Sequence, residues 1–204
     1  MPNQQGLVFI IAAPSGAGKT TIVRKLLAQN PDIKLSISHT TRQPREGEKN
    51  GEDYHFTTVI DFETRIKQNE FLEYAKVYQN YYGTSLSWLK KALSEGHDVL
   101  LEIDVQGAAQ VKEKLPEAIT IFILPPDIQT LEERLTSRQT DSKESIDLRL
   151  AEAKNEIAEA VNYDYTIIND QLDVALYKLN SIVISEHLKT TRQLNFLQNL
   201  LAKA

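Results

Sequence analysis

An apolar run, a glycine-rich loop and a helical pattern follow one another near the start of the chain. Residues 8–11 are β-branched or aromatic and suit a buried strand, and apolar side chains recur at helical spacing from Ile22 onward. The loop between them, residues 13–20, contains Gly16 and Gly18, which allow the backbone to turn its N–H groups toward an anion. The order of strand, loop and helix predicts a phosphate-binding loop.

Each residue type in this loop has a chemical role toward a nucleoside triphosphate. Lys19 can reach the outer phosphates, and the Thr20 hydroxyl can bind Mg²⁺. Position 13 is Ala where the general motif has Gly, so an ordinary tight turn that carries a lysine is the alternative. We expect the phosphate-binding site to include this loop and the residue after it: Ala13, Pro14, Ser15, Gly16, Ala17, Gly18, Lys19, Thr20 and Thr21.

Strand and helix patterns continue to alternate after this loop. Apolar runs at residues 98–105, 119–124 and 165–170 suit buried strands, and helical patterns lie between them. The sequence therefore predicts an α/β fold with a parallel sheet flanked by helices.

Composition and charge limit the function classes. The 204 residues favour one domain, with or without an inserted subdomain, and 41% hydrophobic residues are enough for a core. A net charge of -5 argues against a nucleic-acid partner held by general electrostatic attraction. The absence of Cys excludes disulfides and thiolate metal sites and fits a reducing compartment. No basic leader or membrane-length apolar stretch is present, so we expect a cytoplasmic protein without a membrane partner.

Two arginines flank a proline in the segment 39–48, where the sequence does not favour a helix. The guanidinium groups of Arg42 and Arg45 can therefore point at one target, and their planar shape matches two phosphate oxygens at a time. Solvated loop arginines are the alternative. A second phosphate site would suit a kinase, which needs an anion site for its acceptor as well as one for ATP.

Glu73 lies in a predicted strand that starts at Phe71. Strand alternation puts its side chain on the same side as Phe71, Ala75 and Val77 and away from Leu72. A carboxylate on such a face is partly buried and needs a basic partner or the N–H donors of a ligand. The residue itself leaves a structural and a functional role equally open.

Two further acids end the predicted strand 98–105. Glu102 and Asp104 are two residues apart, so they share a side on a regular strand. Ligands collect at this end of the strands in open α/β sheets, so one or both acids could face Mg²⁺ or a ligand. The alternative is that one of them caps the helix that follows.

The predicted helices beyond residue 126 carry three arginines. Arg134 and Arg138 are four residues apart on one helix, and Arg149 lies on a second helix over about 142–160. Such segments can close over transferring phosphates as a lid, although a solvated helix face is the alternative.

From residue 172 to the end the pattern is helical. Leu188, Leu194, Leu197 and Leu201 fall on one stripe, which predicts docking on the domain or on a second subunit.

Six motifs together resemble the guanylate kinase family, over about residues 7–186. In the order of the family they are Ala-Pro-Ser-Gly-Ala-Gly-Lys-Thr at 13–20, Ser-His-Thr-Thr-Arg-Gln-Pro-Arg at 38–45, Gly-Glu-Asp-Tyr at 51–54, Glu-Phe-Leu-Glu at 70–73, Tyr-Tyr-Gly-Thr at 81–84 and Glu-Ile-Asp-Val-Gln-Gly at 102–107. The resemblance implies a P-loop core over about 1–36, 90–125 and 158–204, a GMP-binding subdomain over about 37–89 and a helical lid over about 126–157.

The resemblance also implies a reaction, the transfer of the ATP γ-phosphoryl group to GMP with Mg²⁺, and the residues that carry it. By motif position the GMP phosphate is bound by Arg42, Arg45, Tyr54 and Tyr82, and guanine is read by Ser38, Glu73, Thr84 and Asp104. Arg134 and Arg138 would contribute to binding ATP, and Thr20 and Glu102 would bind the metal ion. The residues implied in catalysis are Lys19, Arg42, Arg138 and Arg149. The chain departs from the family at Ser137 and Gln139, where glycines often flank the lid arginine, and at Thr84, where some members have Ser.

Two other functions remain as alternatives. A kinase of the same fold could act on a sugar acceptor such as a ribose bisphosphate, but such an acceptor has no base for Glu73, Thr84 and Asp104 to read. A non-catalytic binding module of a scaffold protein would resemble the acceptor region, but such modules usually have a degraded phosphate loop, whereas Lys19 and Thr20 are intact here.

Overall fold

A five-stranded parallel sheet forms the centre of the molecule. The computed structural model describes residues 5–77, 79–136 and 143–202. The strands lie in the order β2 (Ile33–Leu35), β7 (Asp98–Glu102), β1 (Val8–Ala12), β8 (Ile119–Leu124) and β9 (Tyr165–Ile168), and each neighbouring pair is parallel. The predicted α/β fold with a parallel sheet is confirmed.

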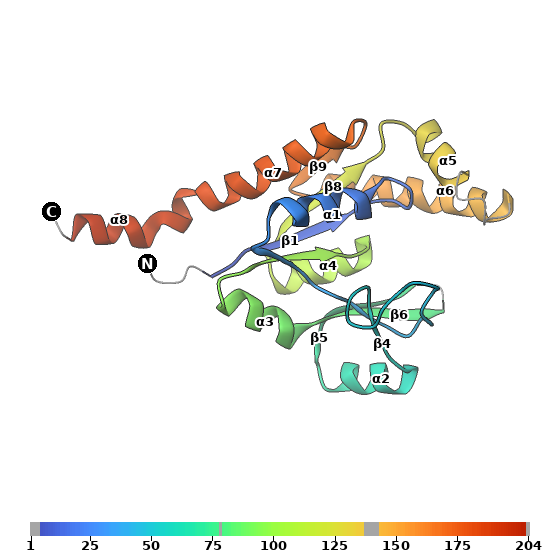
Figure 1. The fold of residues 1–204 in the computed structure, drawn as a ribbon, viewed down its shortest axis with the longest axis horizontal. Helices are drawn as coiled ribbons and strands as arrows, with labels where there is room; N and C mark the ends of the chain where they lie inside the picture. The colour runs from blue at the N-terminus through green and yellow to red at the C-terminus, as the bar shows by residue number, and fades with distance from the viewer. Residues whose placement is uncertain (1–4, 78, 137–142, 203–204) are drawn as a thin grey trace.

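Helices cover both faces of this sheet (Figure 1). Phe9 and Ile11 of β1 pack with α1 (Lys19–Gln29) and α7 (Leu172–Leu188), whereas Val8 and Ile10 pack with α3 (Leu86–Ser94) and α4 (Val105–Lys114). Because both sides of β1 are buried, its sequence is continuously apolar rather than alternating. The phosphate loop therefore starts at the C-terminal end of a buried central strand.

A second, four-stranded sheet forms the inserted subdomain, which lies below the core in Figure 1. Its strands lie in the order β4 (His55–Phe56), β3 (His39–Thr40), β6 (Asn80–Ser85) and β5 (Phe71–Val77). Thr58 caps the N-terminus of helix α2 (Val59–Lys67), because its side chain accepts a hydrogen bond from the Asp61 backbone N–H. Phe62 of α2 stacks on Phe71 and on Tyr81, with ring centroids 4.4 and 5.2 Å apart, and so holds the helix against the sheet.

The strand β5 contains a bulge that the sequence analysis did not predict. Phe71 pairs with Ser85 but Glu73 pairs with Thr84, so Leu72 is an extra residue in the strand. Phe71 contacts α2, Leu72 packs into the core with α3 and α4, and Glu73 lines a cavity. The prediction that Glu73 is buried is confirmed, but the regular alternation from Phe71 is wrong because the bulge shifts the register.

Two helices pair at the right of Figure 1. They are α5 (Ile128–Thr136) and α6 (Lys143–Ala158), which packs through Leu150 and Ala153 on Leu131 and Leu135 and continues into the short 3₁₀ helix η1 (Glu159–Asn162). Arg138 lies outside the described residues.

The C-terminal helical pattern is interrupted. α7 ends at Leu188, and a 3₁₀ turn, η2 (Thr190–Gln193), separates it from α8 (Leu194–Leu201), which extends away from the core sheet (Figure 1). Leu188, Leu194, Leu197 and Leu201 are all exposed. Of the two placements that the sequence left open, docking of this stripe on the domain is therefore wrong, and docking on a second subunit stays a prediction. Within the described residues, no helix has the length and apolar character needed to cross a bilayer.

Candidate active site

The loop between β1 and α1 has the backbone form that a phosphate-binding loop needs. Gly16 and Gly18 adopt φ angles of 91° and 89°, a region that favours glycine. Space adds a second reason at Gly18, because a Cβ atom there would lie 2.5 Å from Nδ2 of Asn169. Asn169 Nδ2 also donates to the Ala17 carbonyl at 2.8 Å. Sequence reasoning missed Asn169, a polar residue directly after an apolar strand.

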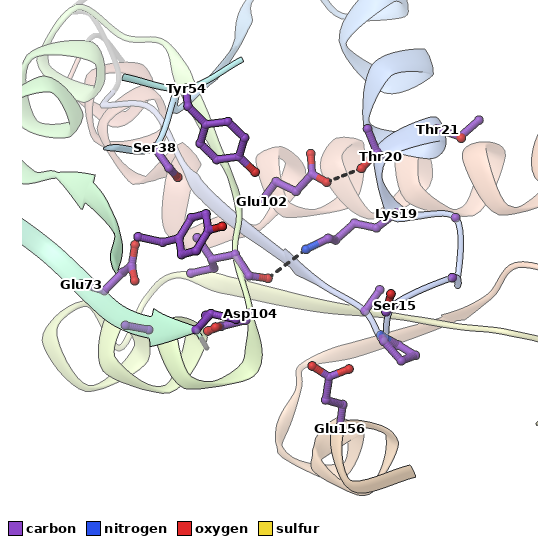
Figure 2. A pocket seen from close by; sticks show the side chains of 18 residues that line it. Ser15, Lys19, Thr20, Thr21, Ser38, Tyr54, Glu73, Glu102, Asp104 and Glu156 are labelled. Carbon is purple, nitrogen blue, oxygen red and sulfur yellow. Dashed lines mark hydrogen bonds between the residues drawn. The ribbon is translucent and has the colours of Figure 1, made fainter. Parts of the chain in front are cut away.

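Lys19 and Thr20 begin α1 and point toward the end of β7 (Figure 2). Lys19 Nζ donates to the Ile103 carbonyl at 3.2 Å, and Thr20 Oγ1 donates to Glu102 Oε1 at 2.8 Å. Burial lowers the pKa of Lys19, an effect that the carboxylates of Glu102, Asp104 and Glu156 oppose. The ammonium group is therefore surrounded by anions and poorly hydrated, so a polyphosphate can replace the contacts that it makes here.

Thr20 and Glu102 also fit the predicted metal role. Both present oxygen atoms, which Mg²⁺ prefers, and Mg²⁺ is commonly held by few protein ligands together with substrate phosphates. Their direct hydrogen bond shows that β7 and α1 bring the two groups to one place.

A cavity of about 480 Å³ joins the phosphate loop to the inserted subdomain. Figure 2 shows side chains from the loop, the subdomain and α6 converging on it. The structure brings most of the predicted residues together in its lining: Ala13, Pro14, Ser15, Gly16, Gly18, Lys19, Thr20, Thr21, Ser38, Tyr54, Glu73, Tyr82, Glu102 and Asp104. Ala17, also in the loop, is fully buried and does not line the cavity. Residues from separate parts of the chain therefore form one site.

Glu73 is the buried acid of this cavity, and only 3% of it is exposed. Burial, with a contribution from Asp104, raises its pKa to about 7, although the hydrogen bond from Thr84 opposes the shift. Thr84 Oγ1 donates to Glu73 Oε1 at 2.6 Å and is itself fully buried. In the structure the Thr84 hydroxyl therefore contacts the base-reading candidate Glu73, and direct contact of Thr84 with the base stays a prediction.

Asp104 has two roles in the structure. Its Oδ1 accepts the Gly107 backbone N–H at 2.8 Å and so caps α4, as the alternative reading of this acid proposed. It also lines the cavity beside Glu73. The cap fixes the carboxylate at the end of β7.

Arg42 does not line this cavity in the structure. Its Nη2 contacts Glu48 Oε1 at 2.7 Å, and its guanidinium lies over the Tyr54 ring with a centroid distance of 5.3 Å. The other oxygen of Glu48 accepts the backbone N–H of Arg45 at 2.7 Å. Glu48, which sequence reasoning missed, thus occupies groups that could hold a phosphate. The signal that could have identified Glu48 is its position three residues after Arg45, close enough in the chain for its carboxylate to pair with the arginines of this segment.

Three further predicted arginines do not line the 480 Å³ cavity. Arg134 Nη2 donates to the Asn169 carbonyl at 3.3 Å and thus connects α5 to the strand end beside the loop. Arg45 and Arg149 line a neighbouring cavity of about 810 Å³, which shares Ser15 and Asp104 with the first.

Glu156 of α6 lines both cavities and was not predicted. Burial raises its pKa, and the nearby Lys19 opposes the shift. Figure 2 shows its carboxylate pointing toward Ser15 of the phosphate loop. Helix α6, the second helix of the predicted lid, therefore carries Glu156 toward the phosphate loop as well as carrying Arg149.

Known proteins are similar in sequence to this chain over nearly its whole length. A family model described as guanylate kinase matches residues 5–186. A guanylate kinase of Neisseria meningitidis is 52% identical over 198 residues, which cover 97% of each chain. The chain belongs to the guanylate kinase family. A guanylate kinase of Nitrosospira multiformis, 50% identical, matches 100% of this chain and 97% of its own length.

A solved member of the guanylate kinase family has the same fold. The crystal structure of guanylate kinase from Anaplasma phagocytophilum superposes with a TM-score of 0.76, at 32% identity, over 93% of this chain and 90% of that one. The sequence resemblance to this family is confirmed, and the chain is a phosphotransferase of the kinase type.

Proposed function

We propose that this chain transfers the γ-phosphoryl group of ATP to GMP, giving ADP and GDP. The supporting observation is the cavity in which Lys19 and Thr20 of the phosphate loop lie opposite Glu73 and Asp104. One end is suited to a triphosphate and the other to a base that offers hydrogen-bond donors. The two substrates can therefore meet end to end in one site.

The chemistry of this reaction explains why cations dominate the site. The nucleophile is a phosphate oxygen of GMP, which is already anionic, so the protein needs no general base. Its task is to bring two like-charged groups together and to neutralise the charge on the transferring group. We assign that task to Lys19 at the loop, to Arg42 and Arg45 at the acceptor phosphate and to the lid arginines Arg138 and Arg149.

Selection of guanine follows from Glu73. Guanine offers N1–H and its 2-amino group as adjacent donors, which an ionised carboxylate can accept, whereas adenine presents an unprotonated N1. Thr84 holds this carboxylate through Oε1, and Ser38 and Asp104 line the same region. A sugar phosphate would leave these groups unmatched, which disfavours the alternative acceptor.

Mg²⁺ would be held by Thr20 and Glu102 together with the ATP phosphates, and it would supply positive charge at the β- and γ-phosphate oxygens. We also propose a cytoplasmic location, since the chain has no Cys and fits a reducing compartment.

The test is a phosphotransfer assay with ATP and Mg²⁺ against a panel of acceptors: GMP, IMP, AMP and a ribose bisphosphate. We expect GDP formation with GMP at the highest kcat/KM of the panel. Equal or better transfer to the sugar phosphate would contradict the proposal, and so would GMP binding without any transfer.

A further inference from the structure

One face of α4 contacts β5 at three neighbouring residues. Gly107, Gln110 and Lys114 are spaced by three and four positions, so they lie along one side of the helix, and we call them the α4 stripe. They meet Glu73, Tyr74 and Leu72 respectively. The stripe belongs to the core, whereas β5 belongs to the inserted subdomain and carries the base-reading acid.

Gly107 lies between the two acids at the guanine end of the cavity. Its N–H donates to Asp104 Oδ1 at 2.8 Å. A Cβ atom on Gly107 would lie 2.7 Å from Glu73 Oε2, 3.3 Å from Glu73 Cδ and 3.4 Å from Asp104 Oδ1. The first distance is shorter than real Cβ contacts, so any side chain here would have to displace the Glu73 carboxylate.

Backbone conformation does not explain this glycine. Gly107 is inside α4 and is absent from the glycines with positive φ among the described residues. Glycine is among the least favourable residues inside a helix, and Ala is the most favourable. The space that Glu73 occupies is therefore the physical reason for glycine at this position.

Gln110 and Lys114 hold the strand on which Glu73 lies. Gln110 Nε2 donates to the Tyr74 carbonyl at 2.8 Å, and Gln110 Oε1 accepts the Tyr74 N–H at 3.3 Å. The Lys114 ammonium donates to the carbonyl of Leu72, the extra residue of the bulge. β5 is the outer strand of its sheet, so these side chains satisfy backbone groups that have no neighbouring strand.

We propose that the α4 stripe determines base specificity by positioning Glu73. Gly107 is a positioning residue that leaves room for the Glu73 carboxylate. Gln110 and Lys114 hold the backbone of β5 and so fix the position of this strand relative to the phosphate loop. The inference rests on the proposed transfer to GMP. Loss of the stripe should therefore weaken recognition of guanine without affecting the ATP side.

The main experiment compares Gly107→Ala with the unchanged chain for kcat/KM toward GMP, IMP and AMP, and for the KM of ATP. A charged hydrogen-bonded contact contributes enough that its loss lowers efficiency by roughly 10- to 100-fold. We expect Gly107→Ala to show this loss of kcat/KM with GMP and a reduced preference for GMP over AMP. The KM for ATP should stay within about twofold of the original value, because the changed contact lies away from the ATP site. Glu113→Ala, an exposed change on the same helix, is the control and should alter none of these values.

A second variant separates positioning from general damage to the fold. Glu73→Asp shortens the acid by one methylene, so the double variant Gly107→Ala with Glu73→Asp gives the added methyl group room. We expect the double variant to recover part of the GMP preference that Gly107→Ala loses, so that the two changes are not additive. Additive losses, or an unchanged preference in a folded Gly107→Ala protein, would overturn the proposal.

If Gly107→Ala does not fold, the pair Gln110→Ala and Lys114→Met tests the same inference through the strand. We expect a drop of about threefold to tenfold in the preference for GMP over AMP, the size of one or two ordinary hydrogen bonds. An unchanged preference in these folded variants would refute the role of the stripe. Failure of the unchanged chain to phosphorylate GMP would instead refute the proposed function.

Discussion

At the scale of single residues, Glu73 controls how the site responds to protons. Its pKa is raised to about 7 because the carboxylate is buried and lies near Asp104. In the binding mode proposed above, guanine donates to the ionised form, so binding of GMP would release the proton that Glu73 holds at lower pH. The same burial that makes Glu73 selective for hydrogen-bond donors therefore makes acceptor binding sensitive to pH.

This linkage predicts that the KM for GMP rises as the pH falls below about 7. When Glu73 must be ionised, affinity should fall by up to about tenfold for each pH unit below its pKa. The Glu73→Gln variant should show a much flatter profile and a lower kcat/KM with GMP, by roughly 10- to 100-fold at pH 8. Because the GMP phosphate titrates in the same range, the informative quantity is the difference between the two profiles. Parallel profiles would contradict the assignment.

The same residue predicts a change in stability. The folded state holds a proton on Glu73 up to about pH 7, whereas the unfolded chain loses it near the ordinary value of 4.5. The contribution of Glu73 to the free energy of unfolding should therefore decrease as the pH rises through this window. Urea titrations of the ligand-free protein and of Glu73→Gln should converge toward pH 4.5 and separate toward pH 7, with Glu73→Gln the more stable at the higher pH. The reverse order would show that Glu73 is ionised and stabilised in the fold.

Lys19 carries a separate prediction at this scale. Removal of its ammonium group in Lys19→Ala should lower kcat at least ~100-fold, the scale of a lost electrostatic contact to the transition state. Lys25→Ala is a matched control on α1, since Lys25 is exposed and pairs with Asp173. Near-normal turnover in folded Lys19→Ala would remove Lys19 from the catalytic set.

At the scale of elements, the segment between β3 and β4 is held in shape by Glu48. This acid contacts the Arg42 guanidinium and the Arg45 backbone N–H. A carboxylate and a phosphate present similar oxygen atoms to arginine. We therefore expect the acceptor phosphate to replace Glu48 at these groups when it binds.

Arg45→Lys tests whether this segment serves the acceptor. The change keeps the charge but removes the two-pronged geometry, so the KM for GMP should rise by about tenfold and the KM for ATP should change much less. Arg24→Lys, an exposed change on α1, should leave both values unchanged. A shift in the KM for ATP alone would show that the two anion sites had been assigned in the wrong order.

The elements also show what the sequence could predict. Strand β1, helix α1 and the loop between them follow from local periodicity and glycine placement, which depend on a few neighbouring residues. The bulge at Leu72 was not predicted, and the carbonyl of its extra residue accepts a hydrogen bond from the Lys114 ammonium, 42 positions away, a contact that local periodicity cannot indicate. Asn169, Glu156 and Gly107 escaped prediction for a related reason, since they act on residues that are far away in the sequence. Glu48 is different, because its contacts with Arg42 and Arg45 are local and could have been predicted from the sequence.

At the scale of the whole molecule, the two C-terminal helices leave apolar side chains uncovered. Leu194, Phe196, Leu197, Leu200 and Leu201 of α8 are exposed, as are Ile184 and Leu188 of α7. Exposed apolar groups that gather on neighbouring helices are typical of a protein interface. The described residues of the domain do not cover them, so we propose that a second copy of the chain does.

This proposal predicts an oligomer in solution. Light scattering after size exclusion should give a mass of at least two chains, and Phe196→Glu with Leu200→Glu should shift it to a single chain, because buried charges would oppose the contact. Gln198→Glu, an exposed change on α8, should leave the mass unchanged. A single-chain mass for the original protein at micromolar concentration would refute the interface.

The place of β1 in the central sheet has a consequence for synthesis on the ribosome. β1 is made first, but its partners β7 and β8 begin about 90 to 110 residues later in the chain. At translation rates of about 5–20 residues per second, the apolar strand β1 stays unpaired for roughly 5 to 20 s before the first of its partners, β7, has been synthesised. The phosphate loop cannot take its form during that time, since the strand on each side of β1 is missing. The nascent chain should therefore be captured by chaperones at residues 8–12 and gain ATP affinity only late in translation.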